Sequence, residues 1–323
     1  MNQLADLIIK ETKRIDKEVD LARLRGKTVI LTGASGLIGT YFLASLRQLR
    51  GVKLVAVIQS KPLQYWRQLA DFSGCQVVRG DLTKLITWQK LPKADYIIHT
   101  AGYGQPARFL AEPMQTLKLN TLAVFKLLEK LKPKGKFLYI SSSEIYTRAE
   151  INHPRYVYIE AKKAGEAICR TVQSQGTAVK ICRLSLAYGP GTKKEDSRVL
   201  NQLIVKGLAG KVSLLDRGEA KRTYGYVTDS VSIMWQILLK GKKLVYNVAG
   251  ESQTTIYSLA KKISQYLKVP LVRGQKNKGV LGAPEIVKID ISQVKKEFNK
   301  LKFVSLSEGL KQTINWQRQL YAA

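Results

Sequence analysis

Short apolar runs rich in β-branched residues alternate along the chain with segments whose apolar residues recur at helical spacing. The runs are typical of buried strands, and a spacing of three to four residues is typical of helices with one apolar face. Strands are predicted at 27–32, 53–58, 76–79, 95–99, 136–140 and 244–250. Helices are predicted at 40–49, about 114–131 and about 157–174. The alternation predicts an α/β fold.

The first 26 residues predict an amphipathic helical extension. Its apolar residues, among them Leu4, Ile8 and Ile15, are interspersed with acidic ones. This mixture argues against a signal peptide, which needs a continuous apolar core. No later segment has the about 18–20 apolar residues of a membrane-spanning helix. We therefore expect a soluble, unexported protein located in the cytoplasm.

Three glycines, Gly33, Gly36 and Gly39, follow the first apolar run at intervals of three residues. In a dinucleotide-binding turn such glycines permit the sharp bend, let a pyrophosphate approach the backbone, and let helix and strand pack closely. The helix N-terminus adds unpaired N–H groups and the positive end of its dipole. An ordinary strand-to-helix turn is the alternative, weakened by the β-branched run before the glycines and the helical segment after them.

Charge and cysteine content narrow the class of protein. The 54 Lys and Arg against 24 Asp and Glu give a net charge of +30, which attracts polyanions. No helix-turn-helix, zinc-finger or aromatic RNA-binding pattern accompanies the charge, so no specific nucleic-acid partner is expected. Cys75, Cys169 and Cys182 lack CxxC spacing, and only His99 and His153 stand beside them. A metal site is therefore not predicted.

The glycine spacing after Thr32 resembles that of the extended short-chain dehydrogenase/reductase family, the nucleotide-sugar epimerases, dehydratases and decarboxylases. The resemblance spans about residues 27–250 and includes the segments 99–102, 141–146 and 183–191. It implies a Rossmann-type doubly wound parallel sheet with a smaller C-terminal α/β lid, bound NAD, and a homodimer formed through the helices at 114–131 and 157–174. The implied domains are a helical extension at 1–26, a cofactor domain at 27–185 with about 230–250, and a lid at 186–229 and 251–323.

Cofactor contacts are implied at the glycine turn and at the ends of the following strands. An acid after the second strand would bind ribose hydroxyls, whereas a basic or small polar residue leaves room for a 2′-phosphate. Gln59 is neither, so these residues leave the choice between NAD and NADP open, and Ser60 and Lys61 favour tolerance of NADP. The resemblance implies NAD. Asp81 either contacts the adenine or caps a helix. The predicted cofactor-binding residues are Gly33, Ser35, Gly36, Leu37, Ile38, Gly39, Gln59, Ser60, Lys61, Asp81, Leu82, Thr100, Ala101, Gly102, Tyr158 and Lys162.

Tyr158 and Lys162 are four residues apart, which places them on one helix face. An ammonium beside a phenol, near a positive nicotinamide, favours the phenolate and lowers its pKa, so Tyr158 is predicted to be a catalytic base. By resemblance, Ser142 takes the place of the catalytic Ser/Thr, followed by Ser143 and Glu144. A carboxylate at Glu144 resembles that of 4,6-dehydratases and UDP-glucuronate decarboxylases and could remove a C5 proton; it is structural in many epimerases.

The resemblance also implies substrate contacts. Arg222, seven residues before Asp229, takes the place of a residue that binds the substrate diphosphate, and Gln105 is placed to contact the sugar. The sequence departs from the family at Leu186, where an Asn is common. A second diphosphate-binding Arg has no clear counterpart. Its neighbours by sequence are Arg273, Lys276 and Lys278.

The sequence therefore predicts an enzyme that modifies a nucleotide-diphosphate sugar with NAD(P), through a 4-keto intermediate, in the manner of an epimerase or dehydratase. Surface-polysaccharide synthesis is the expected pathway. A UDP-glucuronate decarboxylase is one alternative. A non-catalytic dinucleotide-binding protein, with a basic surface for nucleic acid or a partner, is another.

Overall fold

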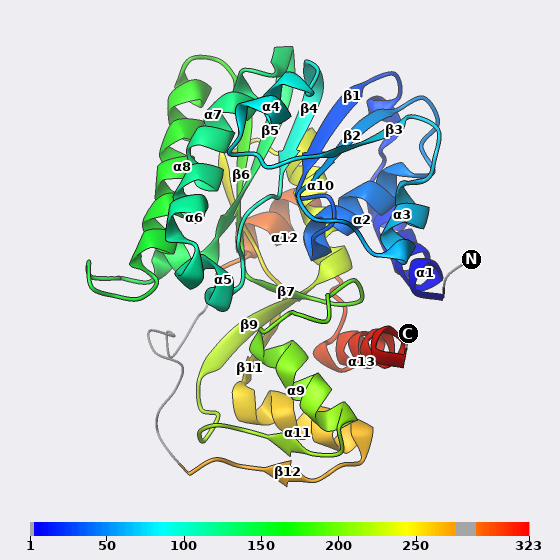
Figure 1. The fold of residues 1–323 in the computed structure, drawn as a ribbon, viewed down its shortest axis with the longest axis vertical. Coiled ribbons are helices and arrows are strands. Elements are labelled where there is room, and N and C mark those ends of the chain that lie inside the picture. Colours follow the sequence, from blue (N-terminus) through cyan, green and yellow to red (C-terminus); the bar gives the residue numbers. More distant parts are fainter. Residues whose placement is uncertain (1–2, 276–288, 323) are drawn as a thin grey trace.

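The computed structural model describes residues 3–275 and 289–322 (Figure 1). Its main sheet has seven strands in the order β10-β6-β5-β4-β1-β2-β3, and every neighbouring pair is parallel. The bounds are β1 Thr28–Thr32, β2 Lys53–Ile58, β3 Cys75–Arg79, β4 Ala94–His99, β5 Leu131–Ser142, β6 Ala178–Leu184 and β10 Val245–Val248. The chain order reverses between β1 and β4, which places a crevice at their carboxyl ends.

Helices cover both faces of this sheet (Figure 1). In chain order the helices packed around this sheet are α1 Gln3–Glu18, η1 Ala22–Leu24, α2 Leu37–Leu46, α3 Gln64–Ala70, α4 Leu85–Gln89, α5 Pro106–Ala111, α6 Pro113–Asn120, α7 Leu122–Leu128, η2 Ser143–Tyr146, α8 Tyr156–Ser174 and α10 Val227–Lys240. Alternation along β1 explains the two layers, because Val29 and Leu31 enter one buried cluster and Ile30 enters the other. The expected doubly wound parallel fold is confirmed.

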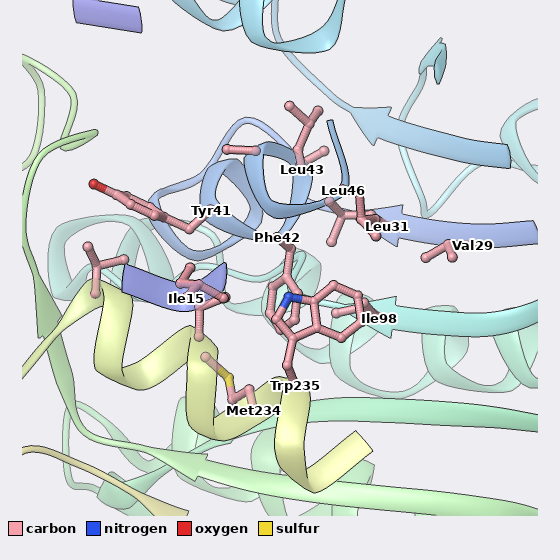
Figure 2. Close-up of a cluster of buried hydrophobic side chains, with 14 of the residues drawn as sticks. Ile15, Val29, Leu31, Tyr41, Phe42, Leu43, Leu46, Ile98, Met234 and Trp235 are labelled. Carbon is pink, nitrogen blue, oxygen red and sulfur yellow. The ribbon is translucent and has the colours of Figure 1, made fainter. Parts of the chain in front are cut away.

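The cluster on the α2 and α10 face is closed by two aromatic rings (Figure 2). Phe42 of α2 meets Trp235 of α10 edge to face, with ring centroids 4.8 Å apart. The Trp235 indole donates a hydrogen bond to Ser45 Oγ at 2.9 Å, so its polar atom is paired although the ring is fully buried. These contacts fix α2, and with it the glycine turn that precedes it.

The predicted N-terminal helix is α1, which ends at Glu18. Ile8 and Ile15 are fully buried, and the helix packs against α2, α10 and α13. The carboxylate of Glu11, also buried, accepts hydrogen bonds from the Tyr226 hydroxyl at 2.7 Å and from Arg14 Nε at 3.2 Å. Because Tyr226 ends β9 (Lys221–Tyr226), a strand of the smaller part described next, α1 joins the two parts of the fold.

The smaller part lies below the main sheet in Figure 1. It contains a sheet in the order β11-β9-β7 and a pair β12-β8. The bounds are β7 Leu186–Tyr188, α9 Val199–Leu208, β8 Val212–Ser213, β9 Lys221–Tyr226, β11 Ser252–Thr255, α11 Ile256–Leu267, β12 Leu271–Val272 and α13 Leu306–Ala322. In contrast, α12 Ser292–Phe298 packs against α10 and β10, beside the main sheet (Figure 1). A separate buried cluster that includes Leu203, Tyr224 and Ile314 holds α9, β9 and α13 together. We retain the predicted domain boundaries as a proposal.

The prediction of one continuous helix at 114–131 is wrong in two respects. The observed helix is interrupted at Thr121, whose ψ is −77°, and the second piece ends at Leu128. The Thr121 hydroxyl donates to the carbonyl of Leu117, four residues earlier, and such back-bonding distorts helices. β5 then begins at Leu131, five residues before the predicted strand. Within the two described ranges, no helix is long and apolar enough to span a membrane.

Candidate active site

The glycine turn has the geometry that a pyrophosphate requires. Gly33 has a φ of +66°, and a Cβ there would lie 2.7 Å from the backbone nitrogen of Ala101. A Cβ on Gly39 would collide with the Gly33 carbonyl oxygen. Gly36 is exposed, and a Cβ there would meet only the Gly33 oxygen, at 3.3 Å. No side chain caps the N-terminus of α2, so the first N–H groups of this helix suit a phosphate.

The end of β4 closes against this turn. The Thr100 hydroxyl donates to the carbonyl of Thr32 at 2.7 Å, and Ala101 lies against Gly33. The ammonium of Lys162 would be 3.6 Å from a Cβ on Gly102. Gly102 is itself exposed. The structure therefore brings Lys162 of α8 to the same edge of the sheet as the glycine turn, as a nicotinamide ribose would require. The residues present fit NAD.

Two buried polar side chains fix the strands behind this edge. His99 Nε2 donates to the Leu119 carbonyl at 2.9 Å, so Nδ1 accepts from the Thr32 hydroxyl at 2.8 Å. Burial lowers the pKa of His99 to about 4, and the ring is neutral at pH 7. Asn120 Oδ1 accepts from the Tyr139 hydroxyl at 2.8 Å. Asn120 thus ties α6 to β5 and does not lie on a solvated helix face.

The residues predicted near the adenosine lie at the ends of β2 and β3. Residues 59–61 are exposed, and Arg79 Nε donates to the carbonyl of Gln59 at 3.5 Å. Asp81 Oδ1 accepts from both the N–H and the hydroxyl of Thr83, each at 2.9 Å. Asp81 thus stabilises the turn after β3 and is not the N-cap of α4, which is Lys84, while the predicted adenine contact stays a prediction. Leu82 is buried. No acidic residue occupies positions 59–61.

Tyr158, Ser142 and Lys162 meet at the carboxyl end of β5. The hydroxyl of Tyr158 is hydrogen-bonded to that of Ser142, and its ring stacks on Phe109 at 4.3 Å. Ser142 Oγ also accepts from the N–H of Glu144 at 3.2 Å. Lys162 Nζ donates to the Ile140 carbonyl at 2.7 Å. All three predicted side chains are less than 9% exposed. Their grouping can hold and move a proton at a substrate hydroxyl.

The chain by itself does not lower the Tyr158 pKa, and the predicted lowering, which includes the charge of a bound nicotinamide, stays a prediction. Burial raises this pKa, and the charge of Glu144 raises it further. The hydrogen bond from Ser142 and the charges of Arg155 and Arg198 lower it, but burial outweighs them. Burial also lowers the pKa of Lys162, to about 8.

Glu144 forms an ion pair that sequence reasoning missed. Arg155 Nη1 donates to Glu144 Oε1 at 2.5 Å, and Arg155 is only 7% exposed. Glu144 Oε2 and Arg155 Nε are buried without a partner in the described chain. Arg155 precedes Tyr158 by three residues, so helical spacing could have identified it. Phe109, in contrast, comes from α5 and carries no such signal. Ser143 is buried at the start of η2.

The predicted substrate contacts come from the smaller part and from the start of α5. Arg222 of β9 donates to the Lys221 carbonyl at 2.8 Å, and burial lowers its pKa. The charges of Arg155 and Glu144 also act on Arg222, so it lies near the same ion pair. Gln105 Oε1 accepts from the N–H and hydroxyl of Ser197, each at 3.4 Å. Gln105 thus connects α5 to the segment before α9.

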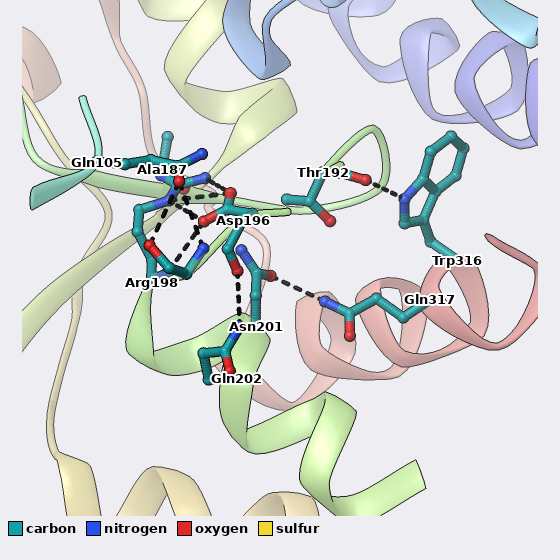
Figure 3. A network of polar contacts seen from close by, with 10 residues as sticks. Gln105, Ala187, Thr192, Asp196, Arg198, Asn201, Gln202, Trp316 and Gln317 are labelled. Carbon is teal, nitrogen blue, oxygen red and sulfur yellow. Dashed lines mark hydrogen bonds and ion pairs between the residues drawn. The ribbon is translucent and has the colours of Figure 1, made fainter. Parts of the chain in front are cut away.

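Figure 3 shows the polar network in this segment. Arg198 Nε donates to both carboxylate oxygens of Asp196, at 2.9 and 3.1 Å, and its Nη1 donates to the Ala187 carbonyl. The Trp316 indole of α13 donates to the carbonyl of Thr192 at 2.8 Å. The network anchors residues 192–198 to α13 and holds the Arg198 charge near Tyr158. Sequence spacing gives no signal for Arg198.

The remaining candidates for a diphosphate contact are less well placed. Arg273 Nε donates to the Arg217 carbonyl at 2.9 Å, and its guanidinium lies over the Tyr257 ring. Lys276 and Lys278 lie outside the described residues.

Leu186 begins β7 and is half-buried. In the described ranges, no group of three or more His, Cys, Asp or Glu residues could hold a metal ion.

Comparison with known proteins agrees with this geometry. The model of the NAD dependent epimerase/dehydratase family matches residues 29–249. A dTDP-4-dehydro-6-deoxy-D-allose reductase of Streptomyces bikiniensis is 28% identical over 92% of this chain and 98% of its own length. A UDP-glucuronic acid decarboxylase 1 of Xenopus tropicalis is 24% identical over 91% of this chain and 72% of its own.

Solved structures agree on the fold. A UDP-glucuronic acid 4-epimerase from Bacillus cereus, in complex with UDP-glucuronic acid and NAD, is similar with a TM-score of 0.77 and 22% identity. The similarity covers 91% of this chain and all of that one. The epimerase Mth375 of Methanothermobacter thermautotrophicus has a TM-score of 0.79 and 17% identity, covering 98% of this chain and 96% of that one.

Proposed function

The chain belongs to the NAD dependent epimerase/dehydratase family, whose model matches residues 29–249 of 323, and on this premise we propose that it modifies a nucleotide-diphosphate sugar through a 4-keto intermediate. Family membership makes the protein an enzyme and NAD its cofactor. The observation that carries the proposal is the buried hydrogen bond between Tyr158 and Ser142 beside Lys162.

Each side chain has a proposed role in the first step. Tyr158 takes the proton of the sugar C4 hydroxyl, and Ser142 shares the proton path. Lys162 orients the nicotinamide ribose. When bound, NAD accepts the C4 hydride and later returns it. Arg222 holds the diphosphate, because a guanidinium binds phosphate oxygens in a planar fork, and Gln105 contacts the sugar.

Epimerisation or dehydration is our first choice for the second step. In an elimination, the proposed role of Glu144 is to remove the C5 proton. Its Oε2 has no partner among the described groups, whereas Oε1 is held by Arg155, so one oxygen is available. In an epimerisation, the keto sugar rotates and is reduced on its other face, and Glu144 stays structural.

Decarboxylation of a UDP-glucuronate-type substrate is the second candidate. Arg155 and Arg198 both act on the Tyr158 hydroxyl, and Arg222 acts on Glu144. Such a concentration of guanidinium groups suits a sugar that carries a carboxylate. Two of the relatives, from Xenopus tropicalis and Danio rerio, are UDP-glucuronic acid decarboxylases. A cytoplasmic homodimer that acts in surface-polysaccharide synthesis is proposed in either case.

Proton NMR tests the proposal directly. The purified protein is incubated with NAD and, in turn, UDP-glucose, UDP-glucuronate, dTDP-glucose and GDP-mannose. A new anomeric signal identifies both the donor and the reaction. A parallel incubation with NADH or NADPH and a 4-keto sugar nucleotide detects net reduction. If every donor stays unchanged while bound NAD is present, the assignment to these substrates is wrong.

The Tyr158→Phe variant separates chemistry from binding. It should keep NAD and lose turnover by a factor of about 100 or more, because general acid–base catalysis contributes at least that much. Tyr156→Phe is the matched control, since Tyr156 lies two residues earlier on the same helix and has Glu160 four residues on. Near-normal turnover in Tyr158→Phe would contradict the proposed role of Tyr158 as the base.

A further inference from the structure

Arg155 is a buried charged residue directly before α8. It occupies the N-cap position of the helix without a side-chain capping hydrogen bond, lies three residues before Tyr158, and is 7% exposed. Its Nη1 is paired with Glu144, and its guanidinium carbon lies 5.7 Å from the centre of the Phe109 ring. That ring stacks on Tyr158. Arg155, Glu144, Phe109 and Tyr158 therefore form one contact group, in which Glu144 is half-buried and the other three side chains are buried.

The charges around the Tyr158 hydroxyl come from several elements. Glu144 lies on η2, Arg155 on the N-cap of α8, and Arg198 before α9. The phenol of Tyr139, on β5, is also within electrostatic range. Among these groups, Glu144 carries the negative charge. A carboxylate disfavours a second negative charge nearby, so Glu144 raises the pKa of the Tyr158 hydroxyl.

We propose that Arg155 is a positioning residue that holds the Glu144 carboxylate in the active site and balances its charge beside Tyr158. The inference rests on the proposed function only in taking Tyr158 as the base. Without Arg155, the negative charge of Glu144 would have no neighbouring positive charge to offset it. It would then disfavour a second negative charge on the Tyr158 hydroxyl. The pair thus lets the site keep a carboxylate for the substrate while Tyr158 can still ionise.

The proposal predicts shifts of opposite sign. Arg155→Gln leaves Glu144 unbalanced and raises the Tyr158 pKa by roughly one unit or more, as expected for a charge within a few ångströms. Glu144→Gln lowers it by a similar amount. The double variant returns it close to the wild-type value. A purely structural role of Arg155 would give no such cancellation.

The ionisation of Tyr158 can be measured without sugar turnover. The NAD-loaded protein is titrated upward in pH while tyrosinate absorbance is recorded. Subtracting the same titration of a matched Tyr158→Phe protein isolates this phenol from the other tyrosines, 15 in all with Tyr158. The subtraction is repeated in the Arg155→Gln, Glu144→Gln and double-variant backgrounds. A failed sugar screen would sink the proposed function and leave this titration interpretable.

Two control variants distinguish the effect of the Arg155 charge from other effects of substitution. Arg170→Gln removes one positive charge from an exposed position of the same helix and should leave the Tyr158 titration in place. Arg155→Lys keeps the positive charge, so the Tyr158 pKa should stay close to the wild-type value. If Arg155→Gln fails to fold or to retain NAD, Glu144→Gln alone must still lower the midpoint. Unchanged midpoints, or shifts of the same sign in both single variants, overturn the proposal.

Discussion

The rings of Phe109 and Tyr158 lie stacked, with centroids 4.3 Å apart and planes inclined by 14°. Phe109 belongs to α5, and Tyr158 belongs to α8. Both are buried, at 3% and 7% exposure. Stacking of this kind stabilises a pair beyond the area it buries, and here it fixes the direction of the phenol toward Ser142. A residue outside the YxxxK pattern thus orients the proposed base.

Replacing Phe109 should therefore affect turnover more than cofactor binding. Phe109→Leu keeps most of the apolar volume and loses the stacked ring. We expect NAD binding to persist and kcat/KM to fall about tenfold, in line with a stacking energy of about 1 kcal/mol. Steady-state kinetics with the donor identified by NMR measures this. Equal losses in NAD affinity and turnover would show that Phe109 acts on the whole fold.

Lys162 should lower the stability of the protein near pH 7. Burial lowers its pKa from 10.5 to about 8, so between these values the unfolded chain binds the proton and the folded chain does not. The free energy of unfolding therefore rises with pH across this window, and below it the cost of the buried charge is complete. Lys162→Met removes that cost and loses the hydrogen bond to Ile140. We expect a gain of about 2 kcal/mol near pH 7 together with loss of turnover.

Urea denaturation near pH 7 and near pH 10 checks this expectation. The difference between Lys162→Met and wild type should shrink at the higher pH, where the folded wild type no longer carries the charge. Lys163→Met, at the exposed neighbouring position, should change little at either pH. A Lys162→Met protein that is less stable than wild type near pH 7 would contradict the argument.

The exposed end of β2 should set the preference between NAD and NADP. Gln59 replaces the acid that would bind the ribose hydroxyls, and Lys61 and Arg79 lie close by in sequence and on the neighbouring strand. Gln59→Asp should tighten NAD and weaken NADP, changing the ratio of their dissociation constants by about tenfold or more. Calorimetric titration with both cofactors measures the ratio. No change in it would place the ribose away from residues 59–61.

Glu11 should matter for stability although it lies outside the catalytic region. Its buried carboxylate accepts from Tyr226 and Arg14. Glu11→Ala leaves the buried Tyr226 hydroxyl unpaired and should cost about 2–3 kcal/mol of unfolding free energy. Asp6→Ala, at an exposed position of the same helix, should stay within about 0.5 kcal/mol of wild type. Denaturant titration compares the two; equal effects would mean that α1 contributes through its apolar face alone.

Site residues could be predicted from the sequence where residues that lie together in the fold are also close together in the chain. The glycine turn and Tyr158 with Lys162 are local patterns, so their elements could be predicted from spacing. The doubly wound sheet followed from family resemblance. Arg198 and Phe109 reach the site from α9 and α5 only through tertiary packing, which no spacing reveals. The raised pKa of Tyr158 in the chain itself could not be read from spacing, because burial, a property of the fold, outweighs the neighbouring charges.

Dimerisation through α6, α7 and α8 remains a prediction, and the exposed side chains of the first two helices make it testable. Met114, Leu122 and Phe125 are 61%, 38% and 52% exposed. Exposed large apolar side chains on the predicted interface helices are expected if these helices are covered by a partner. Phe125→Glu would bury a carboxylate there and should raise the dimer dissociation constant on the order of 100-fold. Leu301→Glu, at an apolar residue that is 71% exposed elsewhere, should leave it unchanged. Sedimentation over a range of concentrations decides, and a wild-type monomer would refute the homodimer.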